Sequence, residues 1–203
     1  TFKHLSLVVI DEQHRFGVKQ RQALESKGKS PHVLIMTATP IPRTMALSVY
    51  GDLDVSFIKG MPPGRHPVKT YVVGSHMLQR IFRFMKKEME SGHQAYVVCP
   101  LVEQSEKQDL AAAVSVYENL RDHVFPQFGV GLVHGRMKNA EKEQVMEDFR
   151  EGKFKLLVAT SVIEVGVNVP DATVMFVYGA DRFGLSQLHQ LRGRVGRGKE
   201  QAY

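Results

Sequence analysis

Short apolar runs recur along this chain, and most of them end in a cluster of polar residues. Uninterrupted apolar runs of this kind are typical of parallel strands that are buried on both faces of a sheet. Stretches with a helical pattern separate the runs, and strands that alternate with helices form βαβ units. The sequence therefore predicts an α/β fold in which helices flank parallel sheets. The predicted strands are 5–10, 33–36, 54–58, 70–73, 95–99, 130–133, 156–159 and 174–178.

The predicted helices follow from apolar spacing and from residues that start or stop a helix. Asn139 is expected to cap one helix, and Gly152 to close it. The stretch after residue 77 carries apolar residues at the i, i+3, i+4, i+7 spacing, and we expect this stripe to pack in the core rather than bind a cofactor. The stripe consists of Leu78, Ile81, Phe82, Met85 and Met89. The other predicted helices are 18–27, 42–49, 109–121 and 187–195.

A segment rich in proline and glycine interrupts the alternation at residues 59–67. It reads KGMPPGRHP and holds three prolines and two glycines, which favour neither a helix nor a strand. We interpret it as a linker between two lobes. The first, residues 1–58, has too few strands for a complete sheet and should expose apolar surface. The second, residues 68–203, is nearly complete.

Composition excludes several classes of protein and site. Cys99 is the single cysteine, so an internal disulfide framework and a cysteine-based zinc site are both excluded. It lies in an apolar run, where a buried and inert thiol is expected. No apolar run approaches the roughly 18 residues of a membrane span. The net charge of +6 suits a polyanionic partner, although an excess of this size is common in ordinary enzymes.

Polar clusters stand at the carboxyl ends of the predicted strands, where open α/β sheets bind their ligands. Asp11 and Glu12 follow the first strand. One carboxylate can hold Mg²⁺ through its waters while the other orients an attacking water, although a simple acidic turn is the alternative. Thr37 and Thr39, after the second strand, can be ordinary turn hydroxyls that cap the next helix. His14 has no second His or Cys at zinc spacing, so a hydrogen-bonding role is expected.

Arginines and glycines are interleaved near the end of the chain, in the stretch QLHQLRGRVGRG at residues 187–198. Arginine offers a rigid fork of donors that matches phosphate, and glycines let the backbone approach a ligand closely. If residues 187–195 are helical, Arg194 and Arg197 lie on one face and point at one anion. Guanidinium groups placed in this way stabilise charge on a transferring phosphoryl group. The alternative is a solvated basic loop.

Four segments, in this order, resemble the superfamily 2 nucleic-acid motors, in which ATP lies between two RecA-like lobes of the P-loop NTPase type. They are DEQH, TATPIPRT, VATSVIEVGVNVP and QLHQLRGRVGRG. Longer stretches, DEQHRFGVKQR, MTATPIPRTMA, GLVHGRMK and DRFGLSQLHQLRGRVGRG, resemble the RecG family of bacterial helicases over nearly the whole chain. The resemblance implies use of ATP and Mg²⁺ by a monomer that acts on branched double-stranded DNA. Its expected substrates are forks and Holliday junctions, in recombination and repair, and its expected location is the bacterial cytoplasm, on the nucleoid.

The same resemblance implies roles for residues that handle the nucleotide. Asp11 and Glu12 match the Walker B carboxylates, for Mg²⁺ held through water and for the catalytic water. Gln190 matches the γ-phosphate sensor, and Arg194 and Arg197 match the arginine fingers, whereas Arg192 does not lie on the nucleotide so consistently in the family. The residues expected to link the nucleotide to the second lobe or to bind its ribose are Gln13, His14 and Asn168. Where Asn168 stands, many relatives have aspartate, so this position keeps hydrogen bonding but loses a charge.

The resemblance also implies DNA contacts and coupling residues. The residues expected to touch the phosphate backbone of one strand are His134, Gly135, Arg136, Thr160 and Ser161. Those expected to couple hydrolysis to movement are Thr37, Ala38, Thr39, Glu164 and Gly166.

Three elements of the family have no match in the sequence: the phosphate loop, the amino-terminal wedge domain and the helical hairpin after the arginine motif. No GxxxxGK[ST] phosphate loop occurs in the 203 residues. In the family this loop lies upstream of residue 1, so we expect the chain to be part of a longer protein and inactive as an ATPase by itself. The transcription–repair coupling factor has a similar motor and is the near alternative, although Gln13 in place of glutamate favours the RecG family. A non-catalytic nucleic-acid-binding module is the alternative of a different class, and ATPase assays with and without branched DNA distinguish the two.

Overall fold

The computed structural model describes residues 5–11, 31–37, 54–58, 60, 64–100, 106–160 and 169–203, without the side chains of residues 106–109. The chain divides into two compact units, Thr1–Phe57 and Ile58–Tyr203. The division lies within one residue of the predicted end of the first lobe. The two units are described separately.

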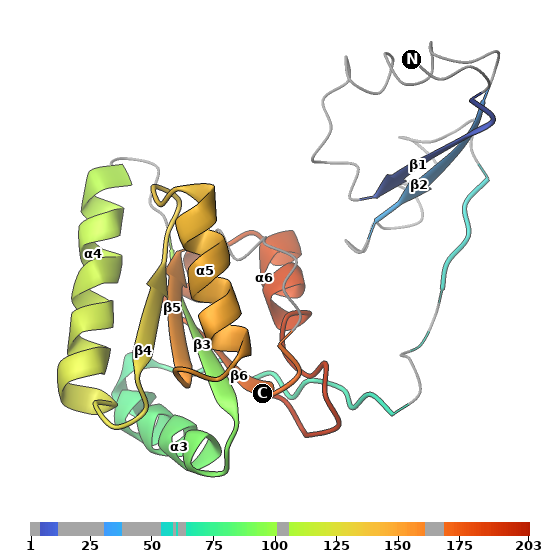
Figure 1. Cartoon of the computed structure of the whole chain (residues 1–203). Helices are drawn as coiled ribbons and strands as arrows, with labels where there is room; N and C mark the ends of the chain where they lie inside the picture. Colours follow the sequence, from blue (N-terminus) through green and yellow to red (C-terminus); the bar gives the residue numbers. More distant parts are fainter. Residues whose placement is uncertain are drawn as a thin grey trace. The chain divides into compact units, whose positions relative to one another are not determined.

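The first unit contains a pair of parallel strands, β1 (Leu7–Asp11) and β2 (His32–Met36), whose register runs from Leu7↔His32 to Asp11↔Met36 (Figure 1). Val8 and Ile10 are buried, whereas Leu7 and Val9 are 56% and 51% exposed. The two predicted strands are confirmed, but the prediction that both of their faces are buried is wrong for this pair. The apolar outer face is exposed, as expected for an incomplete sheet.

The second unit is built on a four-stranded parallel sheet with the strand order β4–β5–β3–β6. Its strands are β3 (Gln94–Cys99), β4 (Val130–Val133), β5 (Leu156–Thr160) and β6 (Ala172–Val177). All residues of β3 and β5 are buried. Two-sided burial of these strands, predicted from their uninterrupted apolar sequence, is therefore confirmed.

Helices cover both faces of this sheet (Figure 1). α3 (Leu78–Glu90) and α4 (Glu106–Asn119) lie on one face, and α5 (Asn139–Arg150) and α6 (Leu185–Arg192) lie on the other. Met85 of the predicted stripe on α3 is fully buried in the core of the first face. Phe149 of α5 is fully buried in the core of the second, beside Tyr96. Short helical turns are η2 (Ser75–Met77), η3 (Leu120–Val124) and η4 (Ala180–Arg182).

Two predicted strands are wrong. Residues 54–58 and 70–73 are irregular, and their apolar side chains reach 100% exposure at Ile58 and 101% at Val72. The apolar pattern is present, but a strand also requires a hydrogen-bonded neighbour. Asn139 is the first residue of α5 and Lys138 occupies the capping position, so the predicted cap was displaced by one residue. Gly152 closes α5 with a φ of 76°, as predicted. The predicted helices 18–27 and 42–49 lie outside the described residues.

An extended segment that the sequence did not predict lies along β6. Tyr203 N donates a hydrogen bond to Thr173 O (2.8 Å), and Met175 N donates to Tyr203 O (2.9 Å), which is a parallel pairing. Lys69 N in turn donates to Ala202 O (2.9 Å). The residues just after the predicted linker therefore lie beside the last residues of the chain.

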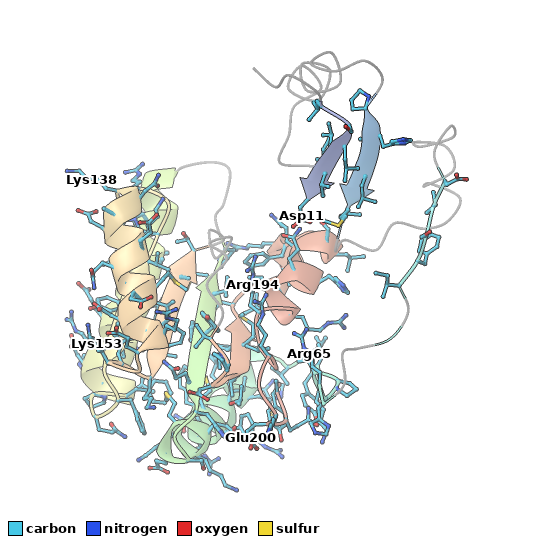
Figure 2. The ribbon with its side chains drawn as sticks, turned by 45° about the vertical axis from the view of Figure 1, so that its right-hand side comes forward. Asp11, Arg65, Lys138, Lys153, Arg194 and Glu200 are labelled. Carbon is cyan, nitrogen blue, oxygen red and sulfur yellow. The ribbon has the colours of Figure 1, made fainter. Side chains whose placement is uncertain are left out.

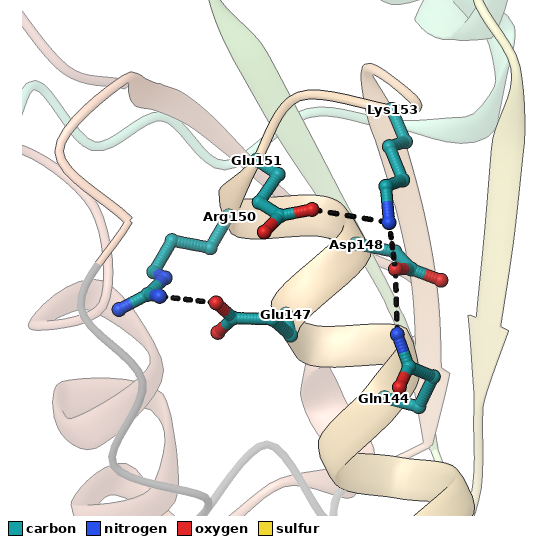
Figure 3. Close-up of polar contacts among 6 residues, drawn as sticks. All are labelled: Gln144, Glu147, Asp148, Arg150, Glu151 and Lys153. Carbon is teal, nitrogen blue, oxygen red and sulfur yellow. Dashed lines mark hydrogen bonds and ion pairs between the residues drawn. The ribbon is translucent and has the colours of Figure 1, made fainter.

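Charged side chains tie the end of α5 to the turn before β5 (Figure 3). Lys153 Nζ lies 2.7 Å from Asp148 Oδ1 and 3.0 Å from Glu151 Oε2. Gln144 Nε2 donates to the same Asp148 oxygen (2.8 Å). Lys153 and Gln144 lower the pKa of the Asp148 carboxyl. The network is exposed and we assign it to the surface of the fold. Among the described residues, no helix has the length and apolarity needed to span a membrane.

Candidate phosphate-binding sites

Two predicted DNA-contact residues meet where β4 and β5 end. Val133 of β4 pairs with Ala159 of β5, so His134 and Thr160, the next residues on each strand, are neighbours. Thr160 is only 1% exposed. Within the described part of the chain, Thr160 Oγ1 and His134 Nδ1 are buried without a hydrogen-bond partner. A buried polar atom without a hydrogen bond costs free energy of folding, and a ligand with oxygen atoms can supply the missing hydrogen bonds.

Positive charge surrounds this pair. Gly135 and Arg136 are exposed in the turn after His134, and Lys142 Nζ of α5 donates to Gly135 O (2.9 Å). Burial, reinforced by the charges of Lys142 and Arg136, lowers the pKa of His134 below its ordinary value. The imidazole is therefore neutral at pH 7, among cations that attract a polyanion. Lys138 stands at the start of α5 on this side (Figure 2).

The second candidate site is the loop after α6, residues 193–198, which we call the arginine loop. α6 ends at Arg192, with Gly193 at its C-cap. The predicted helix 187–195 is thus too long, and Arg194 and Arg197 do not share a helix face. The chain turns at Gly196, whose φ of 68° takes Arg197 out of the line of the helix.

The arginine loop nevertheless brings its guanidinium groups together. Burial raises the pKa of the Tyr96 hydroxyl to about 12, and the charges of Arg194 and Arg197 oppose this rise, so both lie near that hydroxyl. Partial burial lowers the pKa of Arg197, and the nearby charges of Arg194 and Arg65 lower it further. Like charges gathered on one side of a sheet favour binding of an anion such as phosphate.

Arg65 is a member of this cluster that the sequence did not reveal (Figure 2). It lies inside the predicted linker, far from the arginine loop in sequence, and no motif marks it. Its Nε donates to Gly196 O (2.8 Å). The only sequence signal was an arginine just after a proline–glycine turn, which by itself predicts nothing about the partner.

The remaining predicted residues fall into two groups. Asp11 is the exposed last residue of β1, and Thr37 directly follows its partner strand β2, so both stand at the carboxyl edge of the first unit. Gln190 is half-buried on α6. The predicted residues outside the described part of the chain are Glu12, Gln13, His14, Ala38, Thr39, Ser161, Glu164, Gly166 and Asn168.

Each unit by itself offers donors that suit one part of ATP with Mg²⁺. A magnesium ion that keeps most of its waters needs only one or two carboxylates besides the substrate phosphates. Asp11 is exposed at a strand end and can serve as such a ligand through water. Arg194 and Arg197 supply donors for phosphate oxygens. Among the described residues, no three His, Cys, Asp or Glu side chains gather as a metal site.

The family model of the helicase conserved C-terminal domain matches residues 75–199, which include the four-stranded sheet, the His134–Thr160 pair and the arginine loop. The chain belongs to this family of helicase domains.

The whole chain, and not only residues 75–199, is similar to known helicases. It is 56% identical over 202 residues to the ATP-dependent DNA helicase RecG of Bacillus subtilis, covering 100% of this chain and 30% of the relative. It is 55% identical to that of Synechocystis, again over 202 residues, covering 100% of this chain and 24% of the relative. A solved structure of RecG bound to a three-way DNA junction is similar at a TM-score of 0.77 with 48% identity, covering 100% of this chain and 26% of that one. The resemblance to RecG helicases and the RecA-like α/β fold are therefore confirmed.

Proposed function

We propose that this chain is the motor segment of a RecG-type helicase that uses ATP to translocate on branched double-stranded DNA. The relatives at 51–56% identity are RecG helicases, and the similar solved structure is of RecG on a three-way junction. The chain spans at most 30% of these relatives, so the activity is proposed for the whole protein. Fork regression and Holliday junction migration, in the bacterial cytoplasm, are the proposed tasks. The transcription–repair coupling factor is not favoured by these relatives.

The single observation that carries this proposal is the arginine loop, from which the charges of Arg194 and Arg197 both act on the Tyr96 hydroxyl. Fixed guanidinium groups stabilise the charge that develops on a transferring phosphoryl group. Asp11 is proposed to hold Mg²⁺ through water, and when bound this ion would neutralise phosphate charge. Gln190, on the helix that leads into the arginine loop, is proposed to sense the γ-phosphate.

DNA is proposed to lie at the carboxyl ends of β4 and β5. A backbone phosphate there can accept hydrogen bonds from the Thr160 hydroxyl and from Arg136, and it can offset the charge of Lys142. Such contacts carry no sequence information, which suits a motor that must move along any DNA. Each phosphate neutralised by a cation makes binding weaker at higher salt.

The proposal is tested by comparing the 203-residue chain with the full-length protein that carries it. The chain contains no phosphate loop, so we expect it to bind junction DNA in a salt-dependent way without hydrolysing ATP. The full-length protein should show ATP hydrolysis that branched DNA stimulates. A turnover assay measures ATP hydrolysis, and fluorescence anisotropy with a labelled three-way junction measures DNA binding. A full-length protein that hydrolyses no ATP in the presence of junctions would sink the proposal and leave the binding module as the better description.

DNA binding by the chain should strengthen as the pH falls, because of His134. In the absence of DNA, burial and the charges of Lys142 and Arg136 lower the pKa of His134. A bound phosphate offsets these charges and raises that pKa, so the complex takes up a proton. Affinity should then increase by up to about tenfold per pH unit between the two pKa values. Anisotropy titrations from pH 8 to pH 5.5 measure the slope.

Two variants isolate this effect. His134→Asn keeps a polar group but cannot become charged, so its affinity should vary less with pH than that of the parent chain. His76→Asn alters an exposed histidine in η2 and should leave the slope unchanged. If His134→Asn retains the full pH dependence, a different group titrates and the placement of phosphate beside His134 is wrong.

A further inference from the structure

Arg65 reaches the arginine loop by a long-range hydrogen bond. Its Nε donates a hydrogen bond of 2.8 Å to Gly196 O, across a sequence separation of 131 residues, and the contact is partly buried. Gly196 lies between Val195, whose side chain is fully buried, and Arg197. The hydrogen bond therefore acts on the backbone that carries the two arginines proposed to bind phosphate.

Gly196 is the point at which this loop is fixed. Its N–H donates to Ala172 O (3.3 Å), so with Arg65 on its carbonyl both of its backbone groups are bound. Its φ of 68° suits glycine, and an added Cβ would lie 3.0 Å from Ala202 Cβ and 3.3 Å from Val68 Cγ2. The loop thus has little room to adjust at this residue, and the orientation of its peptide sets the directions of Arg194 and Arg197.

The backbone that follows Arg65 is also held in place by hydrogen bonds. Gln201 Nε2 donates to Pro67 O (2.8 Å), and Lys69 N donates to Ala202 O (2.9 Å). The segment that follows Arg65 is therefore fixed along the last residues of the chain. Because this backbone is already ordered, the hydrogen bond of Arg65 to the loop costs conformational entropy of the side chain only.

Electrostatics do not explain why Arg65 lies here. Besides burial, the charges of Arg194 and Arg65 disfavour the charged form of Arg197, so Arg65 and Arg197 repel each other. Since attraction between side chains does not gather them, the hydrogen bond and the packing around Gly196 must do so. A bound anion would relieve this repulsion.

We propose that Arg65 is a positioning residue, which holds the Gly196 peptide so that the arginine loop presents Arg194 and Arg197 to phosphate. This inference rests on the proposed function of that loop. It extends the phosphate site to a residue outside the helicase motifs, near the start of the second unit. Arg65 acts through the loop, and its contact with Gly196 is the whole of its role.

Two substitutions separate the hydrogen bond from the charge. In Arg65→Gln, the amide nitrogen is attached to Cδ, as Nε is in arginine, so a donor remains while the charge is lost. In Arg65→Lys, the charge remains, but a methylene replaces the donor. Arg65→Ala removes both. Arg83→Ala, on the exposed surface of α3, removes one arginine on the other face of the sheet as a matched control.

In the full-length protein, kcat for DNA-stimulated ATP hydrolysis should fall about 10- to 100-fold in the Lys and Ala variants, the size expected when a catalytic group is displaced by about 1 Å. KM for ATP should change by less than about threefold, because the loss falls on the transition state. The Gln and Arg83→Ala variants should stay within about threefold of the parent kcat. If Lys restores activity and Gln does not, charge is what matters and positioning is overturned. Parent kcat in the Ala variant overturns it as well.

A second measurement does not require hydrolysis. In the 203-residue chain, the ¹⁵N–¹H signal of Arg197 reports on the preceding Gly196 carbonyl, and inorganic triphosphate should shift the loop signals. The Arg197 signal should move in the Lys and Ala variants and should stay near its parent position in the Gln variant. An unchanged Arg197 signal in the Ala variant would overturn the inference. If the parent full-length protein shows no ATPase activity while these signals behave as expected, the proposed function fails and the positioning contact stands.

Discussion

Replacing Arg197 with alanine in the full-length protein should lower ATP hydrolysis about 10³-fold or more, the size of effect that arginine fingers show in phosphoryl transfer. Partial burial lowers the pKa of Arg197, and the charges of Arg194 and Arg65 lower it further. Arg197 Nε donates to Gly193 O (3.1 Å), which fixes the side chain across its own loop. A group held in this way stabilises the transition state without reorganising, so the loss should fall on kcat.

Arg192 provides the matched control for this experiment. It is an exposed arginine at the end of α6, and its Nη2 lies 2.9 Å from His189 Nδ1. Arg192→Ala removes the same charge only a few residues away, so it corrects for general weakening of DNA binding. Turnover at saturating ATP and junction DNA should be nearly normal in Arg192→Ala and almost absent in Arg197→Ala. Equal activity in the two variants would show that Arg197 is not an arginine finger.

The sequence predicted those parts of the fold that local pattern determines. Residues 95–99 of β3 and 156–159 of β5 are uninterrupted apolar runs, as expected for strands with helices on both faces of the sheet, and this pattern is visible in the sequence alone. Since the strands are parallel, their carboxyl ends lie at one edge. That is why His134 and Thr160, at the ends of different strands, could be expected to lie together before any contact was known.

Features that depend on distant partners were not predictable. Residues 54–58 and 70–73 carry the apolar pattern of strands, yet they are irregular and exposed, because pattern does not show whether a neighbouring strand is in place. At the candidate site, Arg65 was missed for a similar reason. Its importance follows from a hydrogen bond to a glycine carbonyl, and a backbone acceptor leaves no trace in the sequence at either end. The pairing of Tyr203 with β6 was missed for the same reason.

Phe149→Ala should destabilise the second unit by about 3–5 kcal/mol, as is typical when a buried phenylalanine is truncated. Phe149 is fully buried, and its ring packs against Tyr96 at a centroid distance of 5.0 Å and stacks on Phe154 at 5.5 Å. Truncation removes the ring that both neighbours contact and leaves a cavity beside β3. Hydrogen exchange of the β3 amides under native conditions reports the free energy of unfolding of this unit alone, and it should fall by this amount.

Two further variants show whether burial causes the loss. Phe149→Leu keeps most of the apolar volume, so the loss should be smaller than for alanine. Leu185→Ala truncates an apolar residue of α6 that is 86% exposed, and should change stability by no more than about 0.5 kcal/mol. A loss below about 1 kcal/mol in Phe149→Ala would mean that the core on this face can collapse around the missing ring. Tyr96 rests on that ring and lies beside Arg194 and Arg197. If Phe149→Ala loses the expected stability but the kcat of the full-length protein hardly changes, the arginine loop keeps its position independently of the core that contains Phe149.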